Sequence, residues 1–214
     1  MTRLQKVPPP ALPYAAPAYT PTYIDQLLKV LRLYFSRVSD NINTLIGVDG
    51  GVAIQSPHGM FMSNQDQSSA GTTSANPVTY NQLVIQQGVE VRNNSEIWFS
   101  QPGQYLVTFT LQVSNRGNAS QLFEVWAKYN TTDYPLSNTR FDIPARKSVS
   151  EWSHIVPAVS GIFTVENPET DFLSIVWWSD STSVFLEHYA AGTSPTRPEI
   201  PSVILTVNFV SRLP

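Results

Sequence analysis

The sequence predicts a mainly β protein: an antiparallel jelly-roll sandwich that follows an extended proline-rich arm and one long α-helix. Three observations lead to this fold class. About ten short segments within residues 48–214 alternate apolar and polar side chains and are separated by Pro, Gly and Asn. Only residues 22–47 carry a helical apolar period. Residues 1–21 hold six of the 17 prolines.

The arm, residues 1–21, is predicted to be extended because proline fixes φ and cannot continue a helix. Tyrosines are interleaved with the prolines, and the segment has too little apolar surface to fold on itself. A floppy tail is one interpretation. We favour a docking arm that lies along a partner. Its candidate docking residues are Pro8, Pro9, Pro10, Pro13, Tyr14, Pro17 and Tyr19.

The helix, residues 22–47, is predicted to begin at a Thr20 or Thr22 cap and to end at Gly47. Its apolar residues recur at spacings of four and three, as in a coiled coil. An ordinary amphipathic core helix is the alternative over so short a length. We expect a self-association surface, the helix seam, made of Ile24, Leu28, Leu31, Phe35, Val38, Ile42 and Leu45. Further apolar residues widen the stripe, which indicates a second packing surface: Leu27, Val30, Leu33 and Tyr34.

The remainder, residues 48–214, is predicted to form the sandwich. We expect strands at 58–63, 77–86, 95–100, 105–113, 123–129, 149–165, 172–178, 183–189 and 203–209. The run FLSIVWW at 172–178 is apolar on both faces, which indicates burial on both sides, in a sandwich or against another subunit. From it we predict a sheet seam between subunits, made of Phe172, Ile175, Trp177 and Tyr189.

The composition argues against most kinds of chemistry. The chain has no Cys, which excludes disulfides, thiol nucleophiles and thiolate metal sites. A net charge of −3 argues against nucleic-acid binding, which needs a basic stripe. No catalytic or nucleotide-binding motif is present, and the three His show no ligand spacing. We therefore expect a protein that is not an enzyme, with no catalytic, cofactor-binding or metal residues and no cofactor.

Neither the N-terminus nor any other segment reads as a signal peptide or a membrane span, so we expect cytoplasmic synthesis and no membrane insertion.

Two further features, a group of tryptophans and one arginine, each allow two interpretations. Trp126 with Trp177 and Trp178 could line a sugar-binding surface, but we favour positions in the sandwich core or in a seam between subunits. Adjacent strand residues face opposite ways, so at most one of Trp177 and Trp178 faces solvent. Arg197, between two prolines, either meets a partner or lies in a strand-entry turn.

Two resemblances to known families follow from longer stretches. SQPGQYLVTFTLQV (100–113) and SVILTVNFV (202–210) resemble strands of the complement globular-head and tumour-necrosis-factor-like jelly rolls. Nearly the whole chain is similar to virion structural proteins of marine cyanobacterial phages. The stretches that carry this second resemblance are the proline-rich arm, DQLLKVLRLYFSRVSDNIN, YNTTDYPLSNTRFDIPA and TSPTRPEIPSVILTVNFVS.

The resemblance implies a homotrimer in the virion, with jelly rolls around a threefold axis and the N-terminal helices bundled below them. It also implies a short fibre or knob that projects from the particle. From the long arm followed by a helix, we favour a tail or neck fibre that meets tail, neck, adaptor or capsid proteins through residues 1–35 and projects a knob toward the host. A capsid decoration protein, either cement or head fibre, is the second possibility. A carbohydrate-binding adhesin for a host surface glycan is the third, with loops 64–76 and 114–120 at its tip.

Overall fold

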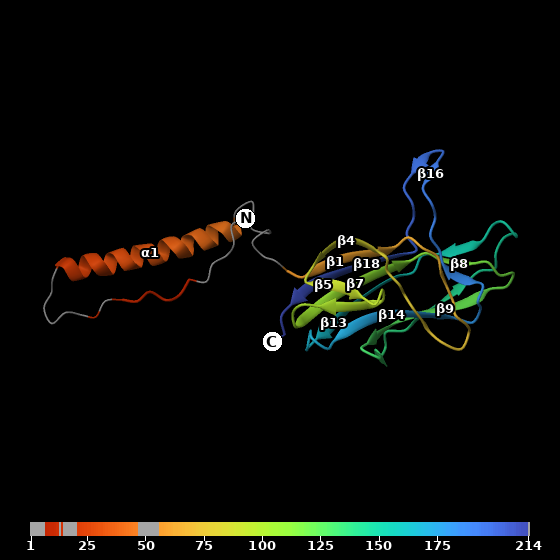
Figure 1. Cartoon of the computed structure of the whole chain (residues 1–214), viewed down its shortest axis with the longest axis horizontal. Helices are drawn as coiled ribbons and strands as arrows, with labels where there is room; N and C mark the ends of the chain where they lie inside the picture. Colours follow the sequence, from red (N-terminus) through yellow and green to blue (C-terminus); the bar gives the residue numbers. More distant parts are fainter. Residues whose placement is uncertain (1–6, 13, 15–20, 47–55, 214) are drawn as a thin grey trace. The chain divides into compact units, whose positions relative to one another are not determined.

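The computed structural model describes residues 7–12, 14, 21–46 and 56–213 (Figure 1). Its contacts divide the chain into two compact units, 1–55 and 56–214. The first unit therefore combines the arm with the helix. The second unit, which we call the β unit, contains all of the described strands.

Within the first unit, the helix α1 spans Pro21–Ile46. It begins one residue earlier than the sequence predicts, because proline is well tolerated in the first turn, where its missing N–H has no helical acceptor. Of the two predicted cap residues, Thr22 lies inside α1, and Thr20 lies outside the described residues, as does the predicted end at Gly47. So do the predicted docking residues Pro13, Pro17 and Tyr19.

The β unit is built from antiparallel sheets, as the alternating patterns predict. The first sheet has the order β13 (Ala158–Val165), β7 (Gly103–Leu111), β18 (Val203–Ser211), β1 (His58–Ser63) and β4 (Gln82–Gln87). The second sheet has the order β10 (Thr132–Asp133), β9 (Gln121–Tyr129), β14 (Phe172–Ser179), β6 (Glu96–Phe99) and β5 (Val89–Arg92). In the second sheet β11 (Thr139–Ile143) also pairs with β9, and β3 (Asn76–Pro77) pairs with β14.

Two smaller sheets complete the β unit. The end sheet has the order β12 (Ser153–Ile155), β8 (Val113–Asn115), β15 (Val184–Leu186) and β2 (Gln67–Ser68). A separate hairpin pairs β16 (Gly192–Thr193) with β17 (Thr196–Arg197). We call residues 190–199 the projecting hairpin, because it stands out from the body of the unit (Figure 1).

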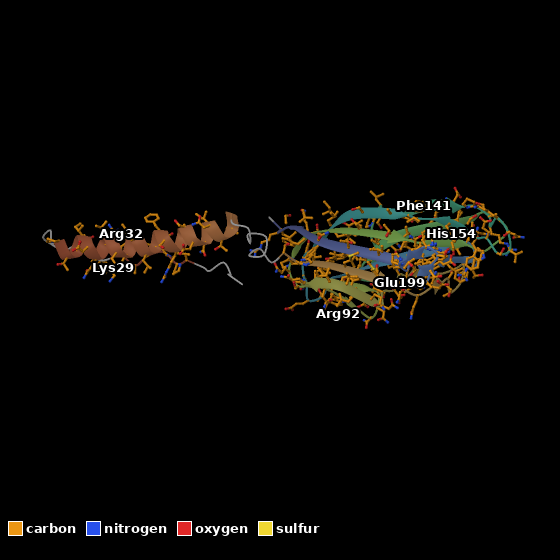
Figure 2. All side chains as sticks on the ribbon, turned by 90° about the horizontal axis from the view of Figure 1, so that it is seen from above. Lys29, Arg32, Arg92, Phe141, His154 and Glu199 are labelled. Atoms are coloured by element: carbon orange, nitrogen blue, oxygen red, sulfur yellow. The ribbon has the colours of Figure 1, made fainter. Side chains whose placement is uncertain are left out.

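The hydrophobic core lies between the first and second sheets. The first sheet contributes Tyr105, Val107 and Leu205, which are fully buried. The second sheet contributes Phe123 and Trp177, whose rings stack at 5.8 Å. The alternation along β7, buried at every second residue, places one face of each sheet against the other. Seen from above, the strands of the first sheet form a single layer (Figure 2).

Two predicted strands are divided in the structure, where the backbone does not continue the hydrogen bonding between neighbouring strands. The strand expected at 149–165 is interrupted at Pro157, which has no N–H to donate, and becomes β12 and β13. The strand expected at 77–86 is also divided, into β3 and β4. Several short elements were not among the strands expected from the sequence, since they are too short to show a period: β2, β5, β10, β11 and the projecting hairpin.

Candidate functional site

The β unit has two distinct ends. The chain enters at one end, where Phe209 of β18 donates its backbone N–H to the carbonyl of Pro57 at 2.9 Å. The C-terminus lies at this same end, whereas the end sheet and the projecting hairpin lie at the other (Figure 1). We call that other end the distal end. It gathers the loops that follow β1, β8 and β15.

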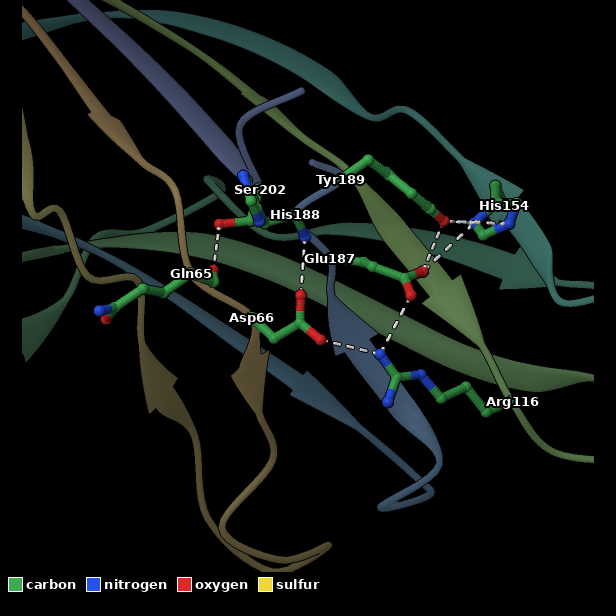
Figure 3. Close-up of polar contacts among 8 residues, drawn as sticks. All are labelled: Gln65, Asp66, Arg116, His154, Glu187, His188, Tyr189 and Ser202. Carbon is green, nitrogen blue, oxygen red and sulfur yellow. Dashed lines mark hydrogen bonds and ion pairs between the residues drawn. The ribbon is translucent and has the colours of Figure 1, made fainter. Parts of the chain in front are cut away.

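A buried carboxylate organises the distal end. Glu187, directly after β15, is 3% exposed. Its Oε1 accepts a hydrogen bond from Nη2 of Arg116 at 3.0 Å, and its Oε2 accepts one from the hydroxyl of Tyr189 at 2.6 Å. The imidazole Nδ1 of His154 lies 3.7 Å from Oε2. Figure 3 shows these side chains converging from three separate segments, since Glu187 and Tyr189 belong to the same one.

Arg116 joins this carboxylate to a second one. Its Nη2 also donates to Oδ2 of Asp66 at 2.9 Å. Its guanidinium lies between two aromatic rings, 4.1 Å from the ring centroid of Trp152 and 3.9 Å from that of Phe185. Cation–π contacts of this kind stabilise a cation that has lost part of its hydration. The arginine is therefore held in one orientation by four neighbours.

The phenol of Tyr189 is a fixed donor in this cluster. Burial and the hydrogen bond to Glu187 raise the pKa of Tyr189 well above its ordinary value. The phenol therefore stays protonated at neutral pH and continues to donate to Glu187. We call the group made of Asp66, Arg116, His154, Glu187, His188, Tyr189 and Glu199 the distal network.

The distal network anchors the base of the projecting hairpin. Tyr189 and Ile200 exchange backbone hydrogen bonds of 3.0 and 2.8 Å across that base. Beside them, Nε2 of His188 lies 3.1 Å from Oε2 of Glu199. The backbone N–H of His188 donates to Oδ1 of Asp66 at 2.8 Å. The hairpin therefore leaves the body of the unit from a fixed platform.

The hairpin itself is almost entirely exposed. Arg197 lies in β17 and is exposed, so the strand-entry turn predicted as one alternative is wrong. Its side chain crosses Gly192 closely, since a Cβ at Gly192 would lie 2.5 Å from Nε of Arg197. Two-stranded ribbons are marginally stable alone. This hairpin depends on the anchor at its base and on whatever it contacts.

The members of the distal network are held by hydrogen bonds and ion pairs to one another. Each carboxylate in it accepts a hydrogen bond or forms an ion pair. Among the described residues, no group of three or more His, Cys, Asp or Glu is placed to hold a metal ion. In the same part of the chain, no helix is long and apolar enough to span a membrane.

The predicted sheet seam is wrong for two of its four residues. Ile175 and Trp177 are fully buried inside a single chain and have no surface to offer a second copy. The other two lie apart: Phe172 stacks on Trp98 at 5.2 Å on the outer face of the second sheet, and Tyr189 lies in the distal network. The four residues therefore form no common surface.

The physical reason is that both faces of β14 are covered within one chain. Its inner face meets the core, where Trp177 packs. On its outer face, Val176 is only 5% exposed, and Trp126 of β9 stands directly opposite it. Trp178 points the same way as Val176, so only one of the two adjacent tryptophans reaches solvent, as the alternation predicts.

The helix seam is exposed on its own chain. Phe35 is 61% exposed, and Leu28, Ile42 and Leu45 are also exposed. Ile24, Leu31 and Val38 are half-buried. Four of the seven seam side chains are therefore exposed within the described residues of one chain.

The arm packs on a different side of the helix. Pro8, Pro9 and Pro10 line one pocket together with Val30, Leu33, Tyr34 and Arg37 of α1. The arm therefore lies beside three of the four residues of the second apolar stripe, although Leu33 stays exposed. Tyr14 is fully exposed, so it makes no such contact.

Two surfaces of the β unit were not expected from the sequence. The five strands of the first sheet contain no Asp, Glu, Lys or Arg. One row across the outer face of this sheet consists of Ile85, Met60, Thr206, Thr108 and Ser160. At the β13 edge, an apolar pocket lies beside Leu136, Ile162 and Phe163. Leu136 is fully exposed there, in a left-handed conformation with φ of 60°.

No protein-family model matches the chain, and no curated protein matches it.

Proposed function

We propose that this chain is a non-enzymatic virion structural protein of a bacteriophage, a short homotrimeric tail or neck fibre. In this proposal the N-terminal arm and helix hold the protein to the particle, and the β unit projects as a knob toward the host surface. The phage assignment rests on the sequence resemblance over the arm, the helix and the C-terminal stretch.

The exposed helix seam is the observation that carries self-association. A row of large apolar side chains at heptad spacing on a solvent-facing helix is the pattern that coiled coils bury. The arm already covers the other apolar side of α1, so the seam is left for a second copy. Burying several such side chains is worth roughly 1.5 to 3 kcal/mol each.

The β unit supports the same assembly with two unlike surfaces. The outer face of the first sheet carries no charge, and charge depletion is typical of the centre of a protein interface. The edge near Leu136 and Ile162 offers exposed apolar side chains. An edge on one copy that packs against a face on the next gives a head-to-tail contact, which closes into a ring when the rotation allows.

The strand order supports a jelly roll. The first and last strands of the β unit, β1 and β18, lie side by side within the first sheet. Between them the chain passes repeatedly from one sheet to the other, as from β4 to β5 and from β6 to β7. Two facing antiparallel sheets with crossing connections of this kind are typical of jelly rolls.

The test is the mass of the full chain in solution, measured by light scattering, followed by protein mass spectrometry of purified particles. A mass near three times 23.8 kDa supports the trimer. Tens of copies or fewer in each particle support a tail or neck fibre, whereas hundreds support a capsid decoration protein. A monomer at all concentrations, or absence from particles, contradicts the proposal.

A carbohydrate-binding adhesin is a second candidate, favoured by Trp126 and Trp178. Both rings lie on the outer face of the second sheet, opposite the face proposed for self-association. Their indole N–H groups are fixed, by Oδ1 of Asp133 at 2.7 Å and the carbonyl of Thr72 at 2.8 Å. Fixed, half-exposed rings suit stacking on sugar rings.

A glycan array tests this candidate. Binding that is lost in Trp126→Ala and Trp178→Ala would support it. Trp98→Ala is the matched control, because the ring of Trp98 lies on the same sheet but already contacts Phe172 and Arg92. Equal binding by all three variants, or no binding by the unmodified chain, would count against it.

A further inference from the structure

The projecting hairpin, residues 190–199, contributes no residue to the hydrophobic core of its own chain. Its residues from Thr193 to Glu199 are all exposed. Apart from its own strand pairing, the interactions that tie it to the unit lie at its base, at His188–Glu199 and Tyr189–Ile200. A ribbon that costs conformational entropy and buries nothing on its own chain indicates a contact elsewhere.

The direction of the hairpin indicates where that contact lies. Figure 1 shows β16 rising from the distal end on the side of β1 and β18. Figure 2, seen from that side, looks onto the outer face of the first sheet. The hairpin therefore stands out beyond the uncharged face, at the distal margin of the sheet. A protein chain that packs against this face therefore lies next to the hairpin.

The base of the hairpin is built to hold this direction. Ile200 ends the hairpin three residues before β18 begins, so the hairpin is joined directly to a central strand of the first sheet. On the other side, Tyr189 is held by Glu187, and Glu187 by Arg116. Burying the carboxylate of Glu187 costs desolvation energy, and its ion pair with Arg116 and its hydrogen bond from Tyr189 offset this cost while holding Tyr189 in place.

We propose that the projecting hairpin is a clasp that reaches onto a neighbouring copy of this chain, packed against the uncharged face of the first sheet. This inference rests on the proposed homotrimer, in which that face is an interface between copies. The exposed side chains of the hairpin suit a protein surface: Thr193, Pro195, Thr196 and Pro198 are small or apolar, and its one cation and one anion, Arg197 and Glu199, balance. Each copy would then complete the interface of the next.

The first experiment is sedimentation of the full chain over a dilution series. Thr193→Glu with Thr196→Glu places two negative charges on the hairpin, where no side-chain hydrogen bond of either threonine is present to be lost. Thr73→Glu with Ser74→Glu is the matched control, since it adds the same charge at an exposed loop of the same unit. We expect the hairpin variant to dissociate at a protein concentration at least tenfold higher than the unmodified chain and the control variant.

The second experiment uses the absence of cysteine from the chain. Thr196→Cys, labelled with a thiol-directed photo-crosslinker, should give covalent dimers and trimers on illumination. Labelled Thr73→Cys should give no covalent dimers or trimers. The melting temperature of each variant is compared with that of the unmodified chain to confirm folding.

The outcomes separate the two proposals. If the unmodified chain is an oligomer but the hairpin variant dissociates at the same concentration and gives no crosslink, the clasp is wrong and the trimer stands. If the unmodified chain is a monomer throughout, both the self-association and the clasp are wrong. Crosslinks within one chain only would also overturn the clasp.

Discussion

Arg116 and Glu187 form an ion pair of 3.0 Å, although 71 residues separate them in the chain. The carboxylate is buried, and the guanidinium lies between the rings of Trp152 and Phe185. The pair joins β8 to the segment after β15 and supports the base of the projecting hairpin. It is the central contact of the distal end.

Removing only the arginine of this ion pair should lower the stability of the fold. Arg116→Met leaves Glu187 buried without its cation, and we expect the free energy of unfolding to fall by about 3 kcal/mol. Urea denaturation measures it. Arg140→Met is the control, because its pair with Glu124 involves an arginine side chain that is 66% exposed, and its loss should cost less than about 1 kcal/mol. Equal losses in the two variants would contradict a buried, organising pair.

The two adjacent tryptophans of β14 should differ in their contribution to stability. Trp177→Ala opens a cavity against Phe123 in the core and should lower the free energy of unfolding by about 3 to 5 kcal/mol. Trp178→Ala removes a half-exposed ring and should cost clearly less. Chemical denaturation of both variants measures the two changes in the free energy of unfolding. Comparable losses would show that Trp177 is not a core residue in solution.

The helix seam should control association. Phe35→Glu with Ile42→Glu places two charges on the seam, and we expect the full chain to dissociate at least tenfold more readily. Ser36→Glu with Asn43→Glu is the control, since it carries the same charges at the same spacing, one residue further along α1, at exposed positions. Sedimentation measures the mass. No difference between the two pairs would show that the seam is not buried between copies.

Asp171 should make stability depend on pH. Burial opposes its ionisation, but hydrogen bonds from the hydroxyl of Tyr129 at 2.5 Å and the backbone N–H of Asn167 at 2.7 Å outweigh burial. The pKa of Asp171 in the folded protein is therefore lower than its ordinary value of 3.8. Because folding lowers this pKa, the ionised carboxylate stabilises the fold at pH values above the ordinary pKa. This contribution is lost as the pH falls through the pKa of the folded protein.

We expect Asp171→Asn to be less stable than the unmodified chain at pH 7, with the difference shrinking as the pH is lowered below the ordinary carboxyl pKa. Urea denaturation across this range measures it. Asp142→Asn, at an exposed position of β11, should show no such trend. A difference that stays constant with pH would mean that the Asp171 carboxylate is not the stabilising species.

Local patterns in the sequence determined much of the fold. The helix period placed α1 within one residue at its N-terminal end, and alternation placed β1 at residues 58–63 as observed. The prediction that the run at 172–178 is buried on both faces is confirmed for Leu173 to Trp177. These features are set by neighbours three, four or two residues away, which a linear pattern records.

The tertiary structure decided what covers each surface. The sequence showed that β14 is apolar on both faces, but only the pairing of Val176 with Trp126 shows that its outer face is covered by the same chain. Pro8 to Pro10 line a pocket together with residues of the second stripe of α1. Asp66, Arg116 and Glu187 meet because three distant segments end at the same place. Contacts of this range depend on strand order, which no local period encodes, so the distal end could be found only in the folded chain.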